Sequence, residues 1–196
     1  MKKLSLYIFL ILFTLQTPSQ ADDIRDFQIE GMSIGDSALD YFSENVIKDN
    51  TNTDYYTNNK YTSVEFFQLS SFKTYDAVGL KYKTDDKKYI IDAIGGTLFC
   101  KKNIEKCNKK QKEIDLELSK MFKKSQREVD KGKHSADKSG KSTFSHINFW
   151  LISGDVVVIE LVDWSEKISN EKRWIDNVIV SFRTEEFNDF LGIAFN

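Results

Sequence analysis

The spacing of apolar residues predicts a helix followed by three strands, twice along the chain. In the first half, an apolar stripe at helical spacing runs through about residue 48, and Asp36 or Ser37 can cap its first turn. Residues 61–69, 75–83 and 89–99 are then predicted as strands, the last two joined as a hairpin by the polar turn at 84–88. Residues 27–34 alternate loosely and predict a short edge strand or an extended arm before this unit.

The second half begins with the clearest helical pattern of the chain, at residues 103–124. Apolar residues and Cys107 recur there at spacings of three and four, with lysines at many other positions. Residues 125–142 contain scarcely any apolar residue and predict a mobile loop. Strands are predicted at 144–152, 155–164 and 174–182, and a short helix after Thr184 closes the chain.

This order of elements predicts an α+β fold, in which antiparallel sheet is covered by helices. We expect a single domain over residues 22–196, because a chain of this length can bury one substantial core. The segments 27–99 and 103–191 share the order of their elements without evident residue identity. Two similar halves within the domain are therefore an open alternative.

The first 21 residues have the layout of a cleavable secretory signal. Lys2 and Lys3 precede a twelve-residue apolar run, and Ser19 and Ala21 supply small residues before the cleavage position. The run is shorter than the roughly 18 residues that a membrane span needs, so an uncleaved anchor is the weaker interpretation. We expect an exported, soluble protein located in the periplasm or in the extracellular medium.

Cys100 and Cys107 are the only cysteines of the chain. In an oxidising compartment a closely spaced pair usually forms a disulfide, and two buried thiols are the alternative. The bond would join the end of a strand to the start of the helix at 103–124, and closing so short a loop adds about 2 kcal/mol. Two cysteines and two distant histidines are too few ligands for a metal site, so we expect no metal and no cofactor.

Charge is distributed unevenly along the chain. The two signal lysines contribute +2 to the formal net charge of −2, so the mature chain carries −4, which favours neither nucleic-acid binding nor stable membrane attachment. Residues 101–141, however, contain 14 Lys and Arg against 7 Asp and Glu. This segment is either a solvated helix face followed by a loop, or a patch for anionic partners that would bind in a salt-dependent way. The candidate patch consists of Lys109, Lys110, Lys112, Lys120, Lys123, Lys124 and Arg127.

No motif in the sequence defines a catalytic site. The run 134–137 (HSAD) places hydrolase-type residues together, but a fold and not a sequence run assembles a triad, so we interpret it as a solvated loop. His146 shares a strand face with aromatic residues, where it is either a packed side chain or a general base. Acidic residues near two tryptophans could serve sugar hydrolysis or sugar binding. The candidate polar site is therefore His146 with Asp163 and Glu166.

Residues 27–44 (FQIEGMSIGDSALDYFSE) resemble the beginning of a group of small exported bacterial proteins of unknown function. The segments 134–143 (HSADKSGKST), 163–167 (DWSEK) and 184–190 (TEEFNDF) are similar to the same group. The resemblance covers most of the mature chain and implies export and a single domain, but no activity.

Gly31-Met32-Ser33 is similar to the turn that precedes a helix and an antiparallel sheet in BamE-type outer-membrane assembly lipoproteins and in the β-lactamase-inhibitor-like fold. The chain departs from the BamE type in its greater length and in lacking a lipobox cysteine.

From these observations we expect a non-enzymatic binding or accessory module of the cell envelope, acting through a sheet face or the basic helix. Its candidate partners are an envelope protein or an anionic envelope component. The alternative is a hydrolase of envelope material that uses carboxylates or His146. The two differ structurally, because an enzyme needs a concave pocket where polar groups converge. An open cleft that holds His146 beside a carboxylate would count against the binding module.

Overall fold

The computed structural model describes residues 23–52, 55–56, 58–101 and 103–194. The predicted signal at residues 1–21 lies outside these described residues. Within them, none of the helices has the length and apolar character that crossing a bilayer requires.

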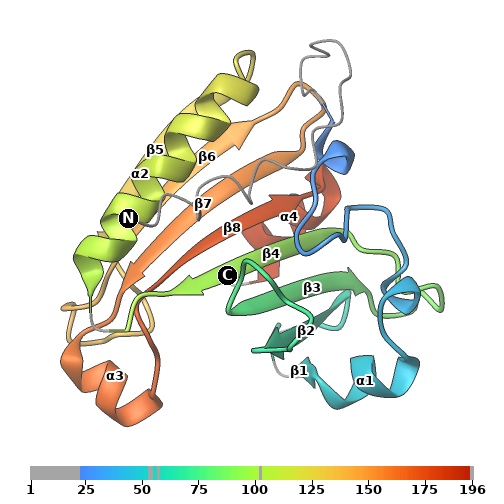
Figure 1. The fold of residues 1–196 in the computed structure, drawn as a ribbon, viewed down its shortest axis with the longest axis horizontal. Helices are drawn as coiled ribbons and strands as arrows, with labels where there is room; N and C mark the ends of the chain where they lie inside the picture. Colours follow the sequence, from blue (N-terminus) through green and yellow to red (C-terminus); the bar gives the residue numbers. More distant parts are fainter. Residues whose placement is uncertain (1–22, 53–54, 57, 102, 195–196) are drawn as a thin grey trace, which may run out of the picture.

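One antiparallel sheet of eight strands forms the centre of the described chain (Figure 1). Its strand order is β1-β2-β3-β4-β8-β7-β6-β5, so two four-stranded meanders meet where β4 pairs with β8. The strands are β1 (Thr51–Asn52), β2 (Tyr61–Phe67), β3 (Ala77–Lys83), β4 (Ala93–Phe99), β5 (Gln126–Lys133), β6 (Thr143–Trp150), β7 (Val156–Asp163) and β8 (Asn177–Arg183). The suggested similarity of the segments 27–99 and 103–191 stays a prediction, because a shared strand order does not establish it.

Helices lie on both faces of the sheet. They are α1 (Glu44–Asp49), α2 (Ile104–Met121), α3 (Glu166–Lys172) and α4 (Glu185–Ala194), with two short 3-10 turns at Ile24–Asp26 and Ala38–Asp40. The long helix α2 packs against β7 and β8, whereas Figure 1 shows α4 behind the sheet, on the opposite face. The two faces are therefore covered by different elements.

The main core fills the space between one sheet face, α2 and the N-terminal segment 24–34. Phe27 of this segment stacks on Phe182 of β8 with ring centroids 5.3 Å apart. A smaller cluster on the other face joins Tyr61 and Ala93 to aromatic residues of α4. Successive residues of a strand point to opposite faces, so β2 and β4 contribute to both clusters.

The predicted α+β fold is wrong, because a single eight-stranded sheet dominates the structure. The largest difference is β5, which was predicted as part of a loop and pairs with β6 along its whole length. Its residues are almost all exposed, so no apolar periodicity could reveal the strand. Backbone pairing holds it, assisted by Arg127, which donates hydrogen bonds of 2.9 and 2.8 Å to Asp115 of α2.

The N-terminal elements also differ from the prediction. Residues 27–34 do not join the sheet, and their apolar side chains face the core instead. The predicted first helix is divided into a 3-10 turn capped by Ser37 and the helix α1 capped by Ser43.

The polar segment 165–173 contains α3, which Ser165 caps by accepting a hydrogen bond from the Ile168 backbone.

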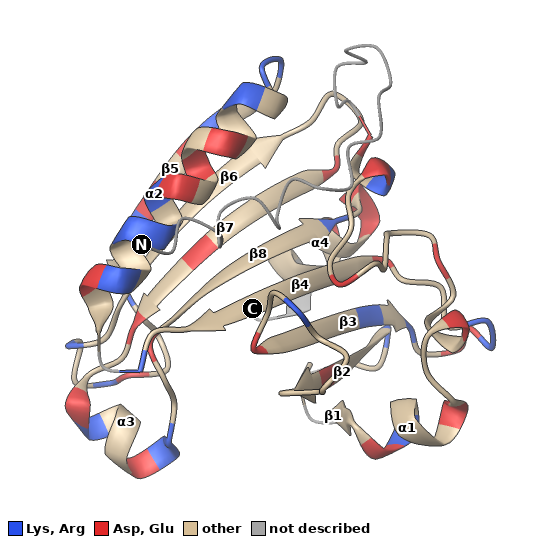
Figure 2. Cartoon of the chain, viewed as in Figure 1, with Lys and Arg blue, Asp and Glu red and all other residues tan. Residues whose placement is uncertain are grey.

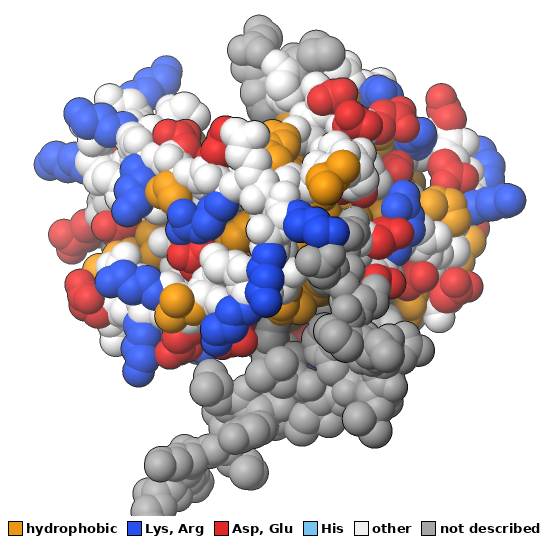
Figure 3. All heavy atoms as spheres, turned by 90° about the horizontal axis from the view of Figure 1, so that it is seen from above, with side chains coloured by type: hydrophobic (Ala, Val, Ile, Leu, Met, Phe, Trp, Pro, Cys, Tyr) orange, Lys and Arg blue, Asp and Glu red, His pale blue; other side chains and the backbone are white. Residues whose placement is uncertain are grey.

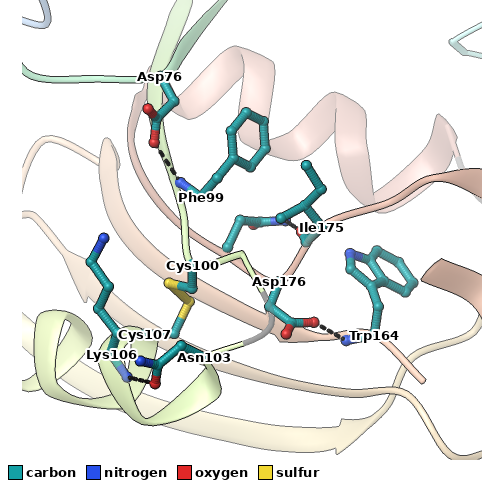
Figure 4. The surroundings of a disulfide bond; sticks show 10 residues. Asp76, Phe99, Cys100, Asn103, Lys106, Cys107, Trp164, Ile175 and Asp176 are labelled. Carbon is teal, nitrogen blue, oxygen red and sulfur yellow. Dashed lines mark hydrogen bonds between the residues drawn. A yellow bond between two sulfur atoms is a disulfide. The ribbon is translucent and has the colours of Figure 1, made fainter. Parts of the chain in front are cut away.

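The predicted disulfide between Cys100 and Cys107 is confirmed, with a Cα–Cα distance of 5.8 Å. Cys100 follows β4 directly, and Cys107 lies on the buried stripe of α2 (Figure 4). The Asp176 carboxylate beside the bond accepts a hydrogen bond of 2.9 Å from the Trp164 backbone. The disulfide therefore fixes the start of α2 to the end of a central strand.

Candidate functional site

The sheet face that turns away from α2 carries a cavity of about 480 Å³, which we call the sheet cavity. Its floor is formed by strands β3, β4 and β8, and Glu160 of β7 and His146 of β6 line one side. Phe187 and Leu191 of α4, together with Tyr55 and Tyr56, form the opposite wall. Ligand sites in proteins typically enclose about 300–1,000 Å³, so the sheet cavity has room for a small organic molecule.

Strand register arranges the cavity floor in rows across the sheet. One row contains Lys81, Ala93 and Arg183, because Ala93 pairs with both of the others. The next row on the same face contains Glu65, Gly79, Gly95 and Ser181. A third row contains Thr97, Ile179, Glu160 and His146. Two cationic side chains thus begin on the same row, with a small residue between them.

The Lys81 ammonium lies within the cavity, with 14% of its side chain exposed. Its Nζ atom is 4.0 Å from the Glu65 carboxylate and 5.2 Å from the centre of the Tyr55 ring. Burial lowers the pKa of Lys81 to about 8; the Glu65 carboxylate opposes this shift and the Arg183 charge adds to it.

The remaining charged groups of the cavity come from β7, β8 and β6. The Arg183 guanidinium donates a hydrogen bond of 3.2 Å from Nε to the Ser181 hydroxyl, and burial lowers its pKa without removing its charge. The Glu160 carboxylate lies 3.6 Å from His146 Nε2. Burial raises the pKa of Glu160, but the hydrogen bond and charge of His146, with the Arg183 charge, outweigh burial and lower it. Glu160 is therefore a carboxylate at neutral pH.

The structure brings only one member of the predicted polar site into the sheet cavity. His146 faces Glu160 there. Asp163 lies at the end of β7 at a position of opposite parity, so it points to the other face of the sheet. Glu166 begins α3 and is exposed. In the described part of the chain, no three His, Cys, Asp or Glu side chains are grouped to hold a metal ion.

The run 134–137 is better ordered than the sequence suggests. Asp137 is 4% exposed, and its carboxylate accepts hydrogen bonds from Ser142 and Ser165. Hydrogen bonds from Ser139, Ser142 and Ser165 lower the pKa of Asp137 well below its ordinary value. The His134 ring packs 4.3 Å from the Trp164 ring. These contacts tie the loop to the start of α3, which is a structural role.

The candidate basic patch is interspersed with acidic residues. Lys110 pairs with Glu113, Lys120 with Glu117 and Arg127 with Asp115, at nitrogen–oxygen distances of 2.8, 3.1 and 2.8 Å. Figure 2 shows the resulting alternation of basic and acidic positions along α2. Figure 3, which views the molecule from above, shows both signs mixed and only small separate apolar patches. Binding of anionic partners by this surface stays a prediction.

Comparisons with models of protein families, with curated proteins and with solved structures found no match to this chain.

Sequence reasoning missed most residues of the sheet cavity. The clearest available signal is Glu160, which is the one acidic residue inside the apolar run at 156–162. Lys81 stands between the apolar residues Leu80 and Tyr82, but such alternation is ordinary for a strand with one face in water. Only the fold shows that the polar face of the sheet is covered and forms a cavity.

Proposed function

We propose that the protein is an exported binding module, and that it holds a small organic molecule in the sheet cavity. The observation that carries the proposal is the convergence of ionisable side chains from five strands on one cavity, where apolar and aromatic groups and a few neutral polar side chains form the rest of the lining. A cavity with a few converging polar groups is the usual form of a small-molecule site. The signal-like first 21 residues and the disulfide support export.

The free-energy cost of burying these charged groups supports a binding role. Burying a charge without full compensation is unfavourable, and Lys81 has no carboxylate closer than 4.0 Å among the described residues. Apolar residues would stabilise the same position better. A ligand that interacts with these groups would offset part of the cost and explain why they are present.

A fluorescence titration with the neutral probe N-phenylnaphthylamine tests the proposal. Its emission rises in an apolar site, and we expect saturable binding of one probe to each protein molecule. The blocking variant is Gly79→Leu, because the only close contact of a Cβ atom at Gly79 is the flexible end of Lys81 at 3.1 Å, with the Val64 carbonyl oxygen at an ordinary 3.9 Å, and the larger side chain then fills the cavity. The matched control is Val129→Leu on the exposed edge strand β5.

Binding that persists in Val129→Leu and is lost in a folded Gly79→Leu variant supports the proposed function. Absence of binding to the wild-type protein, or equal binding to both variants, overturns it.

The pair formed by His146 and Glu160 in the sheet cavity counts against a pure binding module and makes a hydrolase the second candidate. A carboxylate beside a histidine can orient the imidazole as a general base. Hydrolysis of p-nitrophenyl acetate that is abolished in His146→Gln, with probe binding retained, would establish this candidate. Equal rates for the wild-type protein and His146→Gln would exclude general-base catalysis of this ester by His146.

A further inference from the structure

The side chains of Lys81 and Arg183 both extend toward the neighbouring row of the sheet, which contains Gly79, Gly95 and Ser181. A Cβ atom at Gly79 would lie 3.1 Å from Lys81 Nζ, so the ammonium is above Gly79. The Arg183 guanidinium reaches back to the Ser181 hydroxyl, at 3.2 Å. Gly95 lies between Gly79 and Ser181 in the register of the sheet. The two positive groups therefore flank the backbone at Gly95 from opposite sides.

Most of the hydrogen-bonding capacity of these two groups is unused by the described residues. An ammonium has three N–H donors and a guanidinium has five. Among the described residues, the only such bond of either group is the one from Arg183 Nε to Ser181, and the nearest carboxylate to Lys81 is 4.0 Å away. The fork of terminal N–H donors on Arg183 matches the two oxygens of a carboxylate.

The charge balance of the cavity limits the charge of a ligand. Glu65 faces Lys81, and Glu160 interacts with Arg183 and His146, so each cation already has an anionic neighbour. With two cations and two carboxylates the cavity is close to neutral, so a ligand with one negative charge leaves less uncompensated charge to bury than a ligand with two. The third row also contributes Ile179, and the strand ends contribute Phe99 and the exposed rim residue Phe67. These three side chains suit an apolar body, whereas Glu160 and His146 of the same row lie on β7 and β6.

We propose that the sheet cavity binds a small monocarboxylate, whose carboxylate lies between Lys81 and Arg183 above Gly95 and whose apolar body extends toward Phe99 and Phe67. This inference rests on the proposed function and names its ligand class.

The arrangement gives the binding a defined pH dependence. Lys81 faces Glu65 of β2, Arg183 of β8 and the ring of Tyr55, and burial at this position lowers its pKa to about 8. The carboxylate is attracted by the protonated amine, so affinity is retained at neutral pH and falls as the pH rises above about 8. In Lys81→Met this decline is absent.

Two probes of the same shape test the proposal by isothermal titration calorimetry. Naphthaleneacetate carries a carboxylate, and naphthaleneacetamide carries a neutral amide in its place. We expect the carboxylate to bind at least about tenfold more tightly to the wild-type protein. Arg183→Gln and Lys81→Met each reduce this preference severalfold. The control Lys83→Met, in which an exposed lysine on the same strand is lost, retains the preference.

If N-phenylnaphthylamine binds but the carboxylate and the amide bind equally, the ligand class is wrong and the binding cavity remains. Tighter binding of naphthyl phosphate, a dianion, than of naphthaleneacetate overturns the limit to one charge. If none of the probes binds the wild-type protein, the proposed function itself is wrong.

Discussion

Replacing Lys81 by methionine should stabilise the protein at neutral pH. The unfolded chain holds this proton up to a pKa of 10.5, whereas burial lowers the folded-state pKa to about 8. Between these two pKa values the unfolded state binds more protons than the folded state, so the contribution of Lys81 to the free energy of unfolding rises with pH. The full free-energy cost of burying the charged amine is therefore present below pH 8. The difference in pKa corresponds to about 3 kcal/mol, because one pKa unit is about 1.4 kcal/mol. Methionine keeps the apolar stem and removes the charge.

Urea unfolding at pH 7 and pH 10 measures this effect. We expect the free energy of unfolding of Lys81→Met to exceed that of the wild-type protein by about 3 kcal/mol at pH 7, and by less than about 1 kcal/mol at pH 10. Comparing the two proteins cancels the titration of groups that both contain. Lys83→Met is the control, because Lys83 is 45% exposed and its ion pair with Glu186 contributes at most about 1 kcal/mol. A Lys81→Met variant that is less stable than the wild-type protein at pH 7, or whose added stability is the same at both pH values, would show that burial of the Lys81 charge is not destabilising.

Two further predictions concern the supports around the cavity. Replacing Cys100 and Cys107 together by serine should lower the free energy of unfolding in urea by about 2 kcal/mol, while N-phenylnaphthylamine affinity stays within about twofold; loss of probe binding would show that the disulfide positions the cavity. Asp137→Asn should lower the melting temperature at pH 7, and this difference should shrink as the pH falls below about 4. The pKa of Asp137 is lowered in the folded protein, so its carboxylate contributes stability above its ordinary pKa, and this contribution is lost in acid. Calorimetric melting at several pH values checks this, and a difference that does not change with pH contradicts it.

The strands with a buried face were predictable from the sequence, and the exposed strand was not. The runs at 61–69 and 155–164 contain the strands β2 and β7, because their apolar residues face a core. The long helix α2 and its disulfide were predictable for the same reason, since Cys107 continues the apolar stripe. The strand β5 is held by backbone pairing and by contacts such as Arg127 with Asp115, which carry no periodic signal.

The candidate site was mostly beyond the reach of sequence reasoning. His146 could be selected as a histidine on a strand face, but its partner Glu160 is defined by the register of β6 and β7. Lys81 and Arg183 are far apart in the sequence and meet on one row only because β4 pairs with both β3 and β8. Their burial depends on α4 and Tyr55, which cover a face that a polar strand pattern would leave in water.

A crystal structure of the protein soaked with naphthaleneacetate would show where a monocarboxylate binds. We expect the carboxylate within hydrogen-bond distance, about 3 Å, of both Lys81 Nζ and the Arg183 guanidinium, with the rings directed toward Phe99. A probe bound elsewhere, such as beside Trp174, and absent from the sheet cavity would contradict carboxylate binding between Lys81 and Arg183.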